Sequence, residues 1–539
     1  MSQTNAPSSI ARSSAGMAAG TLVSRLLGLI RVLMQAAAIG LTGASADAWT
    51  NANTLPNIIY LLLAGGMLNA VLVPQLTKAM TQRDGGRDYS DRLLTLAAIG
   101  LVVVTVVFTA GSTLLVRFYA PSFHGDQLQL AFAFAIICMP QILFYGLYTL
   151  LGQILNSRDK FAAFMWAPAL ANVVGIVGLA AFLALFPHEA APADWTPSMI
   201  WLLGGSATLG IVLQALVLLY PVWRTGFRWR PRWGFRGVGL RTASRVAMWT
   251  FGIIAVSQVG IWVTSVVVNH ASTSGAKGTA GRFAYEQASL LFVLPHSLIT
   301  LSLVTALFPR MSRAAHARNL PALRSDLRHG LRLIGVAMIP VSLGMLLLGP
   351  AIASTLFFSN AASDTRALAY VMMAMVCGLV PYAVLTLTWR AFYAFEDAKT
   401  PFRLQIVITA VSVCGTLLSL LLPPDRVAVG AGLSQAVGQL AACVVAVVWI
   451  RRRLEGLSLF VVVRTYVRLG IAGLLGAGAA YLVHLGLAQV LTGRIGSLLT
   501  LVLGGGVLLV IYIVVAKRLR VTEVDELLGS ITRKLRSLR

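Results

Sequence analysis

Long apolar stretches separated by short polar connectors dominate the chain. A helix needs about 20 mostly apolar residues to cross the hydrocarbon core of a bilayer, and fourteen stretches are candidates for such helices. They lie near 17–40, 48–76, 94–117, 128–156, 162–186, 199–222, 246–270, 285–308, 329–357, 367–394, 402–422, 428–450, 466–491 and 496–516. The pattern predicts an all-α polytopic membrane protein with about fourteen transmembrane helices.

Composition narrows the class of protein further. Of the 539 residues, 57% are hydrophobic and 11% are charged, whereas a soluble domain carries about 25% charge. This excludes a water-soluble enzyme, and also a disordered chain, which needs low hydrophobicity. Residues 1–20 lack the apolar core of a signal peptide, so the first span is expected to insert by itself. The four cysteines have no metal-ligand or disulfide spacing.

The excess of basic residues follows the connectors. There are 43 Lys and Arg against 18 Asp and Glu, a net charge of +25. One alternating set of connectors holds 35 of the basic residues and the other set holds six. Basic loops mark the cytoplasmic side, so both termini are predicted to be cytoplasmic. This topology explains the charge better than a nucleic-acid partner does, and none is expected.

An internal repeat is visible at two span exits. L-V-P-Q-L-T-K-A at 72–79 and L-F-P-R-M-S-R-A at 307–314 are similar and lie 235 residues apart. Both fall on the same predicted side, which indicates a parallel repeat about an axis along the membrane normal, as in transporters. The alternative is a chance similarity between two amphipathic span exits.

The repeat predicts five segments. They are an N-terminal lobe (1–223), a basic cytoplasmic linker (224–245), a C-terminal lobe (246–455), an appended helix pair (456–516) and a basic cytoplasmic tail (517–539). The linker interleaves Arg with Trp and Phe, which is typical of a segment on the inner leaflet with its arginines on lipid headgroups.

Two arginines lie inside the first predicted span. A charge at that depth indicates a functional site. Arg25 and Arg31 are six residues apart, which places them about 120° apart on a helix, on one broad face. Guanidinium groups suit an anionic, phosphate-bearing ligand. The alternative is that Arg25 extends to the membrane surface and only Arg31 is deep.

Acidic and amide residues lie at the beginning of two other predicted spans. Asp47 begins a polar, Pro56-containing stretch that reaches Asn57, and such a helix entry is tolerated where it lines a cavity or packs in protein. Asp47 is expected either to pair with one of the arginines or to interact with the helix dipole. Glu286 near Arg282 is either a gate partner for a basic residue or an interfacial carboxylate.

Several short motifs resemble one transporter family. They are S-R-L-L-G-L-I-R at 24–31, D-A at 47–48, L-P-N at 55–57, V-P at 73–74, I-L-N at 154–156, A-P-A-L-A-N at 167–172 and D-A-K-T-P at 397–401. Together they resemble the MurJ/MviN family of lipid II flippases, in the multidrug/oligosaccharidyl-lipid/polysaccharide exporter superfamily. The resemblance covers essentially the whole chain.

The resemblance implies two six-helix lobes, a final helix pair that forms a groove for the lipid tail, and a cationic central cavity. Lipid II would move from the inner to the outer leaflet of the cytoplasmic membrane by alternating access. Substrate-binding residues would be Ser24, Arg25, Arg31 and Asn57, with Asp47 in the outer gate. The family's Y-A-D-R is replaced by A-Y-E-Q at 284–287, so Arg282 is the candidate substitute for its arginine, with Glu286 in the gate.

The remaining expectations concern energy, partners and alternatives. No cofactor, metal or catalytic residue is expected. The membrane potential or a monovalent ion would supply the energy for transport. Membrane lipids and cell-wall synthesis proteins would be partners. The alternative functions are export of another polyprenyl-linked glycan or export of drugs. A drug exporter would need acidic groups in the cavity, and a membrane-embedded glycosyltransferase would need an acid or base in a large outer loop.

Overall fold

The computed structural model describes residues 6–63, 87–156, 158, 160–227, 229–233, 245–276, 278–491, 493–526 and 529, which form helices and connecting turns without a strand. Eleven of the described helices are long and apolar enough to cross a membrane, and up to thirteen if two bent helix pairs each count as one span. The all-helical polytopic class is therefore confirmed. The count of fourteen is not confirmed, because the second predicted span, 48–76, extends past Leu63 into residues outside the described part.

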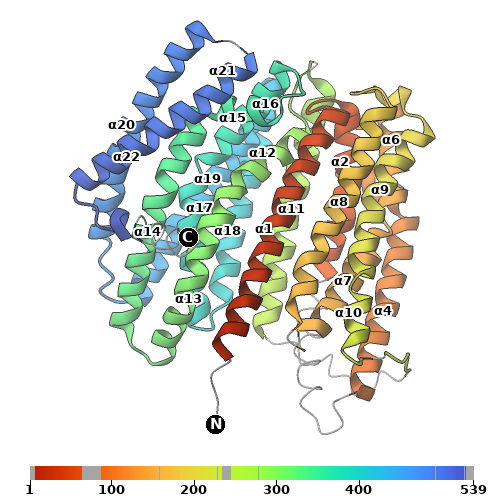
Figure 1. Cartoon of the computed structure of the whole chain (residues 1–539), viewed down its shortest axis with the longest axis horizontal. Coiled ribbons are helices and arrows are strands. Elements are labelled where there is room, and N and C mark those ends of the chain that lie inside the picture. The colour runs from red at the N-terminus through yellow and green to blue at the C-terminus, as the bar shows by residue number, and fades with distance from the viewer. Residues whose placement is uncertain are drawn as a thin grey trace. The chain divides into compact units, whose positions relative to one another are not determined.

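The described residues form two compact units, Met1–Gln258 and Val259–Arg539. In the first unit (red to yellow-green in Figure 1) the helices are α1 (Ala6–Ile39), α2 (Ala44–Leu63), α4 (Arg87–Ala110), α5 (Ser112–Tyr119), α6 (Gly125–Cys138), α7 (Gln141–Asn156), α8 (Phe161–Leu185), the short η2 (Pro192–Asp194), α9 (Pro197–Leu216) and α10 (Leu219–Arg224). The boundary between the units lies within α11 (Arg245–Ser274). The five sequence segments stay a prediction.

Small residues let the helices of the first unit approach closely. A Cβ at Gly210 on α9 would lie 2.8 Å from the carbonyl oxygen of Ala171 on α8, so only glycine permits this spacing. Three aromatic rings pack together in this unit: Phe134 meets Trp49 edge-on at 5.0 Å between centroids and Trp195 at 5.3 Å. Together these contacts fix α2 against α6 and α8 against α9.

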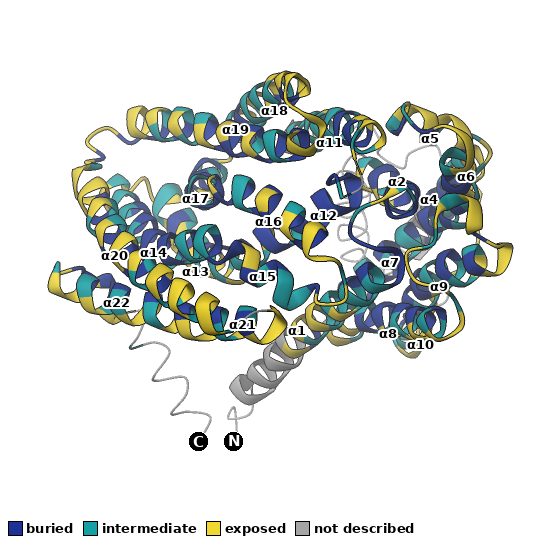
Figure 2. Ribbon diagram, turned by 90° about the horizontal axis from the view of Figure 1, so that it is seen from above, coloured by how far each residue is buried: buried dark blue, intermediate teal, exposed yellow. Residues whose placement is uncertain are grey.

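The second unit contains α12 (Arg282–Pro295), the π-helix η4 (His296–Thr300), α13 (Leu301–His316), α14 (Leu320–Leu347), α15 (Gly349–Leu356), α16 (Ala362–Val376), α17 (Leu379–Ala394), α18 (Lys399–Leu418), η5 (Ser419–Leu421), α19 (Pro424–Arg453), α20 (Phe460–Val490), α21 (Gly493–Leu499), the π-helix η6 (Thr500–Gly504) and α22 (Gly505–Arg518). Figure 2 shows α18 and α19 with exposed outer faces and buried faces toward neighbouring helices. Large exposed apolar side chains such as Leu440 and Val444 on α19 fit contact with lipid.

Helices α20 and α22 are fastened to α14 by polar contacts. The hydroxyl groups of Tyr466 and Tyr512 donate to the carbonyl oxygens of Leu331 and Val336 on α14, at 2.9 and 2.8 Å. Arg332 of α14 pairs with Glu523 at 2.6 Å. The described residues that follow α22 pack on the second unit, because Val521, Glu523 and Val524 are all buried.

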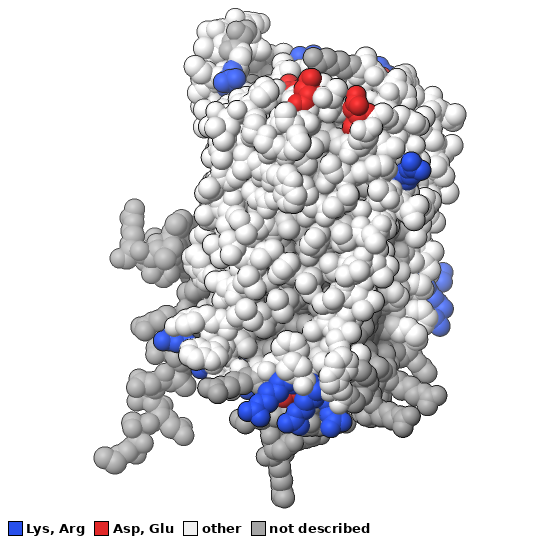
Figure 3. Space-filling view, turned by 90° about the vertical axis from the view of Figure 1, so that its right-hand side faces the viewer, with Lys and Arg blue, Asp and Glu red and all other residues white. Residues whose placement is uncertain are grey.

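Two predicted spans are bent rather than straight. The segment Leu94–Ala110 meets Ser112–Tyr119 at 67°, and Ala362–Val376 meets Leu379–Ala394 at 45°. A Cβ at Gly111, between the first pair, would lie 3.2 Å from the carbonyl oxygen of Val107, so glycine suits this bend. Figure 3 shows one face of the molecule on which the described charged side chains gather mainly at the two ends, as a membrane-spanning surface requires.

Candidate functional site

A small polar cavity lies inside the first unit, among α1, α2, α7, α8 and α9. Its volume is about 180 Å³. Of the sixteen described residues that line it, Arg31 is the one with a formal charge. Pockets for drug-sized ligands measure about 300–1,000 Å³, so this cavity by itself takes water or a small anionic group rather than a sugar-peptide headgroup.

Arg31 extends from α1 into this cavity. Its Nε is buried and has no hydrogen-bond partner among the described residues. Gly175 on α8 makes room for the side chain, since a Cβ there would lie 2.8 Å from Cδ of Arg31. A buried donor on a cationic group without a partner is costly, and an anionic ligand entering the cavity would remove that cost.

Trp49 on α2 is a second residue of the cavity lining with an unpartnered donor. Its ring is 2% exposed and packs edge-on against Phe134, while its Nε1 has no hydrogen-bond partner in the described part of the chain. Trp49 was not among the predicted site residues, although it lies two positions after Asp47. An indole inside a polar stretch at a helix entry was the signal that could have identified it.

Amide and hydroxyl groups complete the polar wall. Gln141 on α7 donates to the hydroxyl oxygen of Thr208 on α9 at 2.9 Å and reaches Oδ1 of Asn53 on α2 at 3.5 Å. Asn172 on α8 donates to the carbonyl oxygen of Ser24 on α1 at 2.9 Å. This bond links α8 to α1 at the edge of the cavity.

The structure does not bring every predicted residue into this cavity. Arg25 and Asn57 are exposed, and neither lines it. Ser24 contributes its backbone carbonyl to Asn172. The roles of Ser24, Arg25 and Asn57 toward a substrate therefore stay predictions.

Asp47 is fully buried in the first turn of α2. Its backbone carbonyl accepts a hydrogen bond from the side-chain amide of Asn51 at 2.8 Å. The chain before α9 covers this helix end, because the Ser45 hydroxyl donates to the carbonyl oxygen of Ala190 at 2.7 Å and the Trp195 indole donates to Ser45 at 3.0 Å. Asp47 is thus covered by the chain that precedes α9, and it lies two positions before Trp49 on α2.

In the second unit, Arg282 and Glu286 face each other across one turn of α12. Nη2 of Arg282 lies 2.7 Å from Oε1 of Glu286. Arg282 is 6% exposed, so its charge is compensated inside the protein. The neighbouring Tyr285 donates to the side-chain oxygen of Gln435 on α19 at 3.1 Å, which ties this end of α12 to α19.

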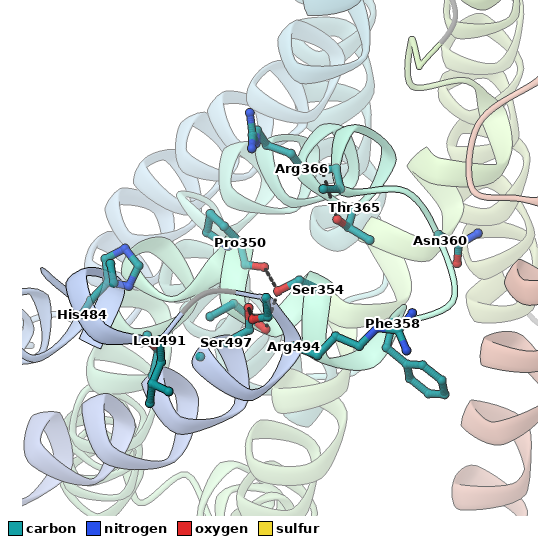
Figure 4. Close-up of a pocket in the computed structure, with 16 residues that line it drawn as sticks. Pro350, Ser354, Phe358, Asn360, Thr365, Arg366, His484, Leu491, Arg494 and Ser497 are labelled. Atoms are coloured by element: carbon teal, nitrogen blue, oxygen red, sulfur yellow. Dashed lines mark hydrogen bonds between the residues drawn. The ribbon is translucent and has the colours of Figure 1, made fainter. Parts of the chain in front are cut away.

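A larger pocket of about 450 Å³ lies in the second unit where α15 and α16 meet the turn between α20 and α21. Figure 4 shows Arg366 on α16, Arg494 on α21 and His484 on α20 around it, with Ser354 bonded to the carbonyl oxygen of Pro350. The guanidinium of Arg494 lies over the Phe358 ring at 5.5 Å. None of these residues was among the predicted site residues.

The described residues contain no group of three or more His, Cys, Asp or Glu placed to hold a metal ion. The four cysteines are free.

Comparison with known proteins places the chain among transporters. The family model described as lipid II flippase MurJ matches residues 35–503. A probable lipid II flippase MurJ of Rhizobium tropici is 27% identical over 531 residues, which cover 95% of each chain. The lipid II flippase MurJ of Burkholderia cenocepacia is 28% identical over 404 residues, covering 73% of this chain and 75% of that one.

Solved structures agree with this assignment at the level of the fold. A lipid II flippase MurJ in an inward closed conformation superimposes with a TM-score of 0.70 at 18% identity, covering 93% of this chain and 99% of that one. An inward-facing multidrug resistance MATE family transporter gives a TM-score of 0.61 at 18% identity, covering 80% and 95%. With the family model matched over most of the sequence, the chain belongs to the lipid II flippase MurJ family.

Proposed function

We propose that this protein moves lipid II from the inner to the outer leaflet of the cytoplasmic membrane, and that Arg31 binds the diphosphate of the substrate. The observation that carries the proposal is that Arg31 and Trp49 line one cavity and that each has a buried donor, Nε and Nε1, without a partner among the described residues. A phosphate oxygen accepts from such donors, and a guanidinium adds a charge that favours it.

The size of the cavity limits what it binds. A volume of about 180 Å³ takes the phosphate end of the headgroup, so the sugars and peptide would lie outside it. Binding at Arg31 would thus select for the diphosphate, which all polyprenyl-diphosphate lipids share, rather than for a particular glycan. Discrimination between glycans would depend on other residues, for which Ser24, Arg25 and Asn57 are the candidates.

Alternating access needs contacts that form on one side and break on the other. We assign Asp47, buried in the first turn of α2, and Glu286 on α12 to the outer gate. Arg282, which pairs with Glu286, stays a candidate for binding the substrate. Each group is held inside the protein at the start of a helix, so opening of that end would expose it to water and change its hydration. The orientation with both termini in the cytoplasm belongs to the same proposal and follows the basic connectors.

The energy source proposed is the membrane potential or a monovalent ion. A charge that crosses 100 mV gains about 2.3 kcal/mol, which is enough to bias the direction in which a diphosphate lipid is transported. The partner proposed is lipid II itself, with surrounding membrane lipids and cell-wall synthesis proteins that consume the flipped lipid. Transport rather than catalysis is the activity that the family implies.

The function is tested by depleting the protein in cells that have no second flippase. We expect lipid II to accumulate on the inner face and to stop appearing on the outer face. Normal outer-face appearance after depletion would contradict the proposal. Native mass spectrometry of the purified protein separates the alternatives. Retained lipid II supports the proposal, whereas a different retained glycan lipid favours an exporter of another polyprenyl-linked glycan.

A further inference from the structure

A second cavity in the first unit, of about 470 Å³, is built from apolar side chains alone. Leu94 on α4 and Leu150 and Ile154 on α7 form its buried wall. Trp223 on α10 and Trp229 lie at its rim, and their side chains are 62% and 45% exposed. The cavity is therefore buried at one side and bordered by exposed indoles at the other. Such a lining offers water very few hydrogen-bond partners.

The wall that carries Trp229 is fixed to α4 by hydrogen bonds. The Trp229 indole donates to the hydroxyl oxygen of Thr95 at 3.2 Å, and the backbone N–H of Arg230 donates to the Asp91 carboxylate at 3.3 Å. The N–H of Arg232 also donates to Thr95, at 3.1 Å. Because three hydrogen bonds hold residues 229–232 against α4, this wall of the cavity has a defined position.

Basic side chains surround the same end of the unit. Arg158 donates to the carbonyl oxygen of Thr225 at 2.5 Å and lies over the Phe227 ring at 5.5 Å. Arg224 and Arg230 are exposed and directly follow the rim residues Trp223 and Trp229. Figure 3 shows basic side chains gathered at the lower end of the face that it displays, the end at which Figure 1 places α10. The nearby Asp91 is 5% exposed, so little negative charge faces outward here.

We propose that this cavity holds an acyl chain of an anionic membrane phospholipid, with its phosphate beside Arg224 and Arg230. The apolar lining fits a hydrocarbon chain, the exposed indoles fit the level of the headgroups, and the arginines match an acidic headgroup. The phospholipid would fasten α4, α7, α10 and the linker to one another. This site lies in a different part of the unit from the Arg31 cavity and does not depend on the substrate of the transporter.

The headgroup preference is measured by native mass spectrometry of the delipidated full chain. The probes are phosphatidylglycerol and phosphatidylcholine with identical acyl chains. One arginine near an anionic headgroup contributes about fivefold in affinity, so Arg224→Gln and Arg230→Gln should each weaken phosphatidylglycerol binding about fivefold. Phosphatidylcholine binding should weaken less, because its choline cation offsets the charge of the phosphate. Equal retention of both lipids by the unaltered protein would overturn the proposal.

The cavity itself is tested by filling it. Ala98→Phe on α4 places a ring among the lining residues, and we expect retained phosphatidylglycerol to fall at least about tenfold. The matched control is Ala110→Phe, at an exposed position of the same helix, which should retain lipid normally. Equal retention by both variants would show that the acyl chain is elsewhere.

A direct contact readout remains usable if Ala98→Phe does not fold. Phosphatidylglycerol with brominated acyl chains quenches tryptophan fluorescence on contact. We expect quenching in the unaltered protein and a clear loss of the quenched component in a Trp223→Phe, Trp229→Phe double variant. An unchanged quenching amplitude in that double variant would refute the assignment of the acyl chain to this cavity.

Discussion

Gly175 on α8 leaves the space that the side chain of Arg31 on α1 occupies. A Cβ at Gly175 would lie 2.8 Å from Cδ of Arg31 and 4.0 Å from its Nη1. The stem of the arginine is therefore positioned by the absence of a side chain on the facing helix. The same helix carries Asn172, which binds the carbonyl oxygen of Ser24, so α8 both holds α1 and shapes the path of Arg31.

The first prediction follows from this contact. Gly175→Val should displace the side chain of Arg31 from the cavity, because overpacking a close contact costs about 1–3 kcal/mol unless the neighbour shifts. We expect complementation of a depleted strain to fall at least about tenfold while the amount of protein in the membrane stays normal. The control is Gly205→Ala on α9, where a Cβ makes an ordinary 3.7 Å contact with Trp201. Equal growth of both variants would contradict the positioning role.

The second prediction separates binding from stability at Trp49. Trp49→Phe keeps a ring against Phe134 but removes the unpartnered Nε1 donor. Removing a buried donor that has no partner leaves the ligand-free protein equally or more stable. We expect lipid II binding to weaken by at least about tenfold, since the lost hydrogen bond to a charged group contributes about 1.5–3 kcal/mol. The measurements are thermal unfolding without substrate and titration with lipid II, and a fall in stability with unchanged binding would count against a ligand role.

The third prediction concerns the fastening of the appended helices. Glu523 is 4% exposed and pairs with Arg332, whose side chain is 26% exposed and also donates to Thr465 on α20. Glu523→Gln should lower the free energy of unfolding by roughly 2–3 kcal/mol, because it leaves a half-buried cation without its counter-charge. Asp525→Asn is the control, since its partner Lys517 is exposed and such pairs contribute about 0–1 kcal/mol. Similar unfolding midpoints for both variants would argue against the fastening.

The fourth prediction is a pH dependence at Asp397, between α17 and α18. Burial alone would raise the pKa of this carboxyl, but the N–H and hydroxyl of Thr400 and the guanidinium of Arg453, at 2.6 Å, together lower the pKa below its ordinary value. A lowered folded-state pKa means that the stabilisation is complete above the unfolded-state pKa of about 3.9. It is lost as the pH falls through the folded-state value.

Asp397→Asn should therefore destabilise the protein at pH 7 and do so progressively less below about pH 4. The measurement is the unfolding midpoint of both proteins from pH 7 to pH 3. A difference that stays constant over this range would mean that the charge of Asp397 contributes nothing.

Much of the fold could be predicted because a bilayer imposes long apolar helices. The limits of the first, fourth and fifth predicted spans, for example, agree closely with Ala19–Ile39, Gly125–Asn156 and Ala162–Leu185. The bends at 111 and 377–378 could not be predicted, because hydropathy reports the length of an apolar stretch and not its direction. The first copy of the repeated motif, at 72–79, lies outside the described residues, so the repeat stays a prediction.

The candidate site was only partly predictable, for a geometric reason. A charge such as Arg31 is conspicuous inside a span, and so it was identified at once. Arg25, on the same helix, is exposed, because a separation of about 120° allows one residue to face the cavity and the other to face away. Gln141 and Gly175 were missed because each is common in membrane helices and matters only through what the neighbouring helix places opposite it. Trp49 was missed although its position in a polar helix entry was a usable signal.

The most direct measurement is the rate at which proteoliposomes containing Arg31→Gln translocate lipid II, compared with the unaltered protein and with Arg31→Lys. Glutamine retains hydrogen-bonding capacity but removes the charge. The account predicts a loss of at least about tenfold for Arg31→Gln and a smaller loss for Arg31→Lys, which keeps the cation but not the forked geometry. A normal rate for a folded Arg31→Gln protein would contradict the claim that this guanidinium binds the diphosphate.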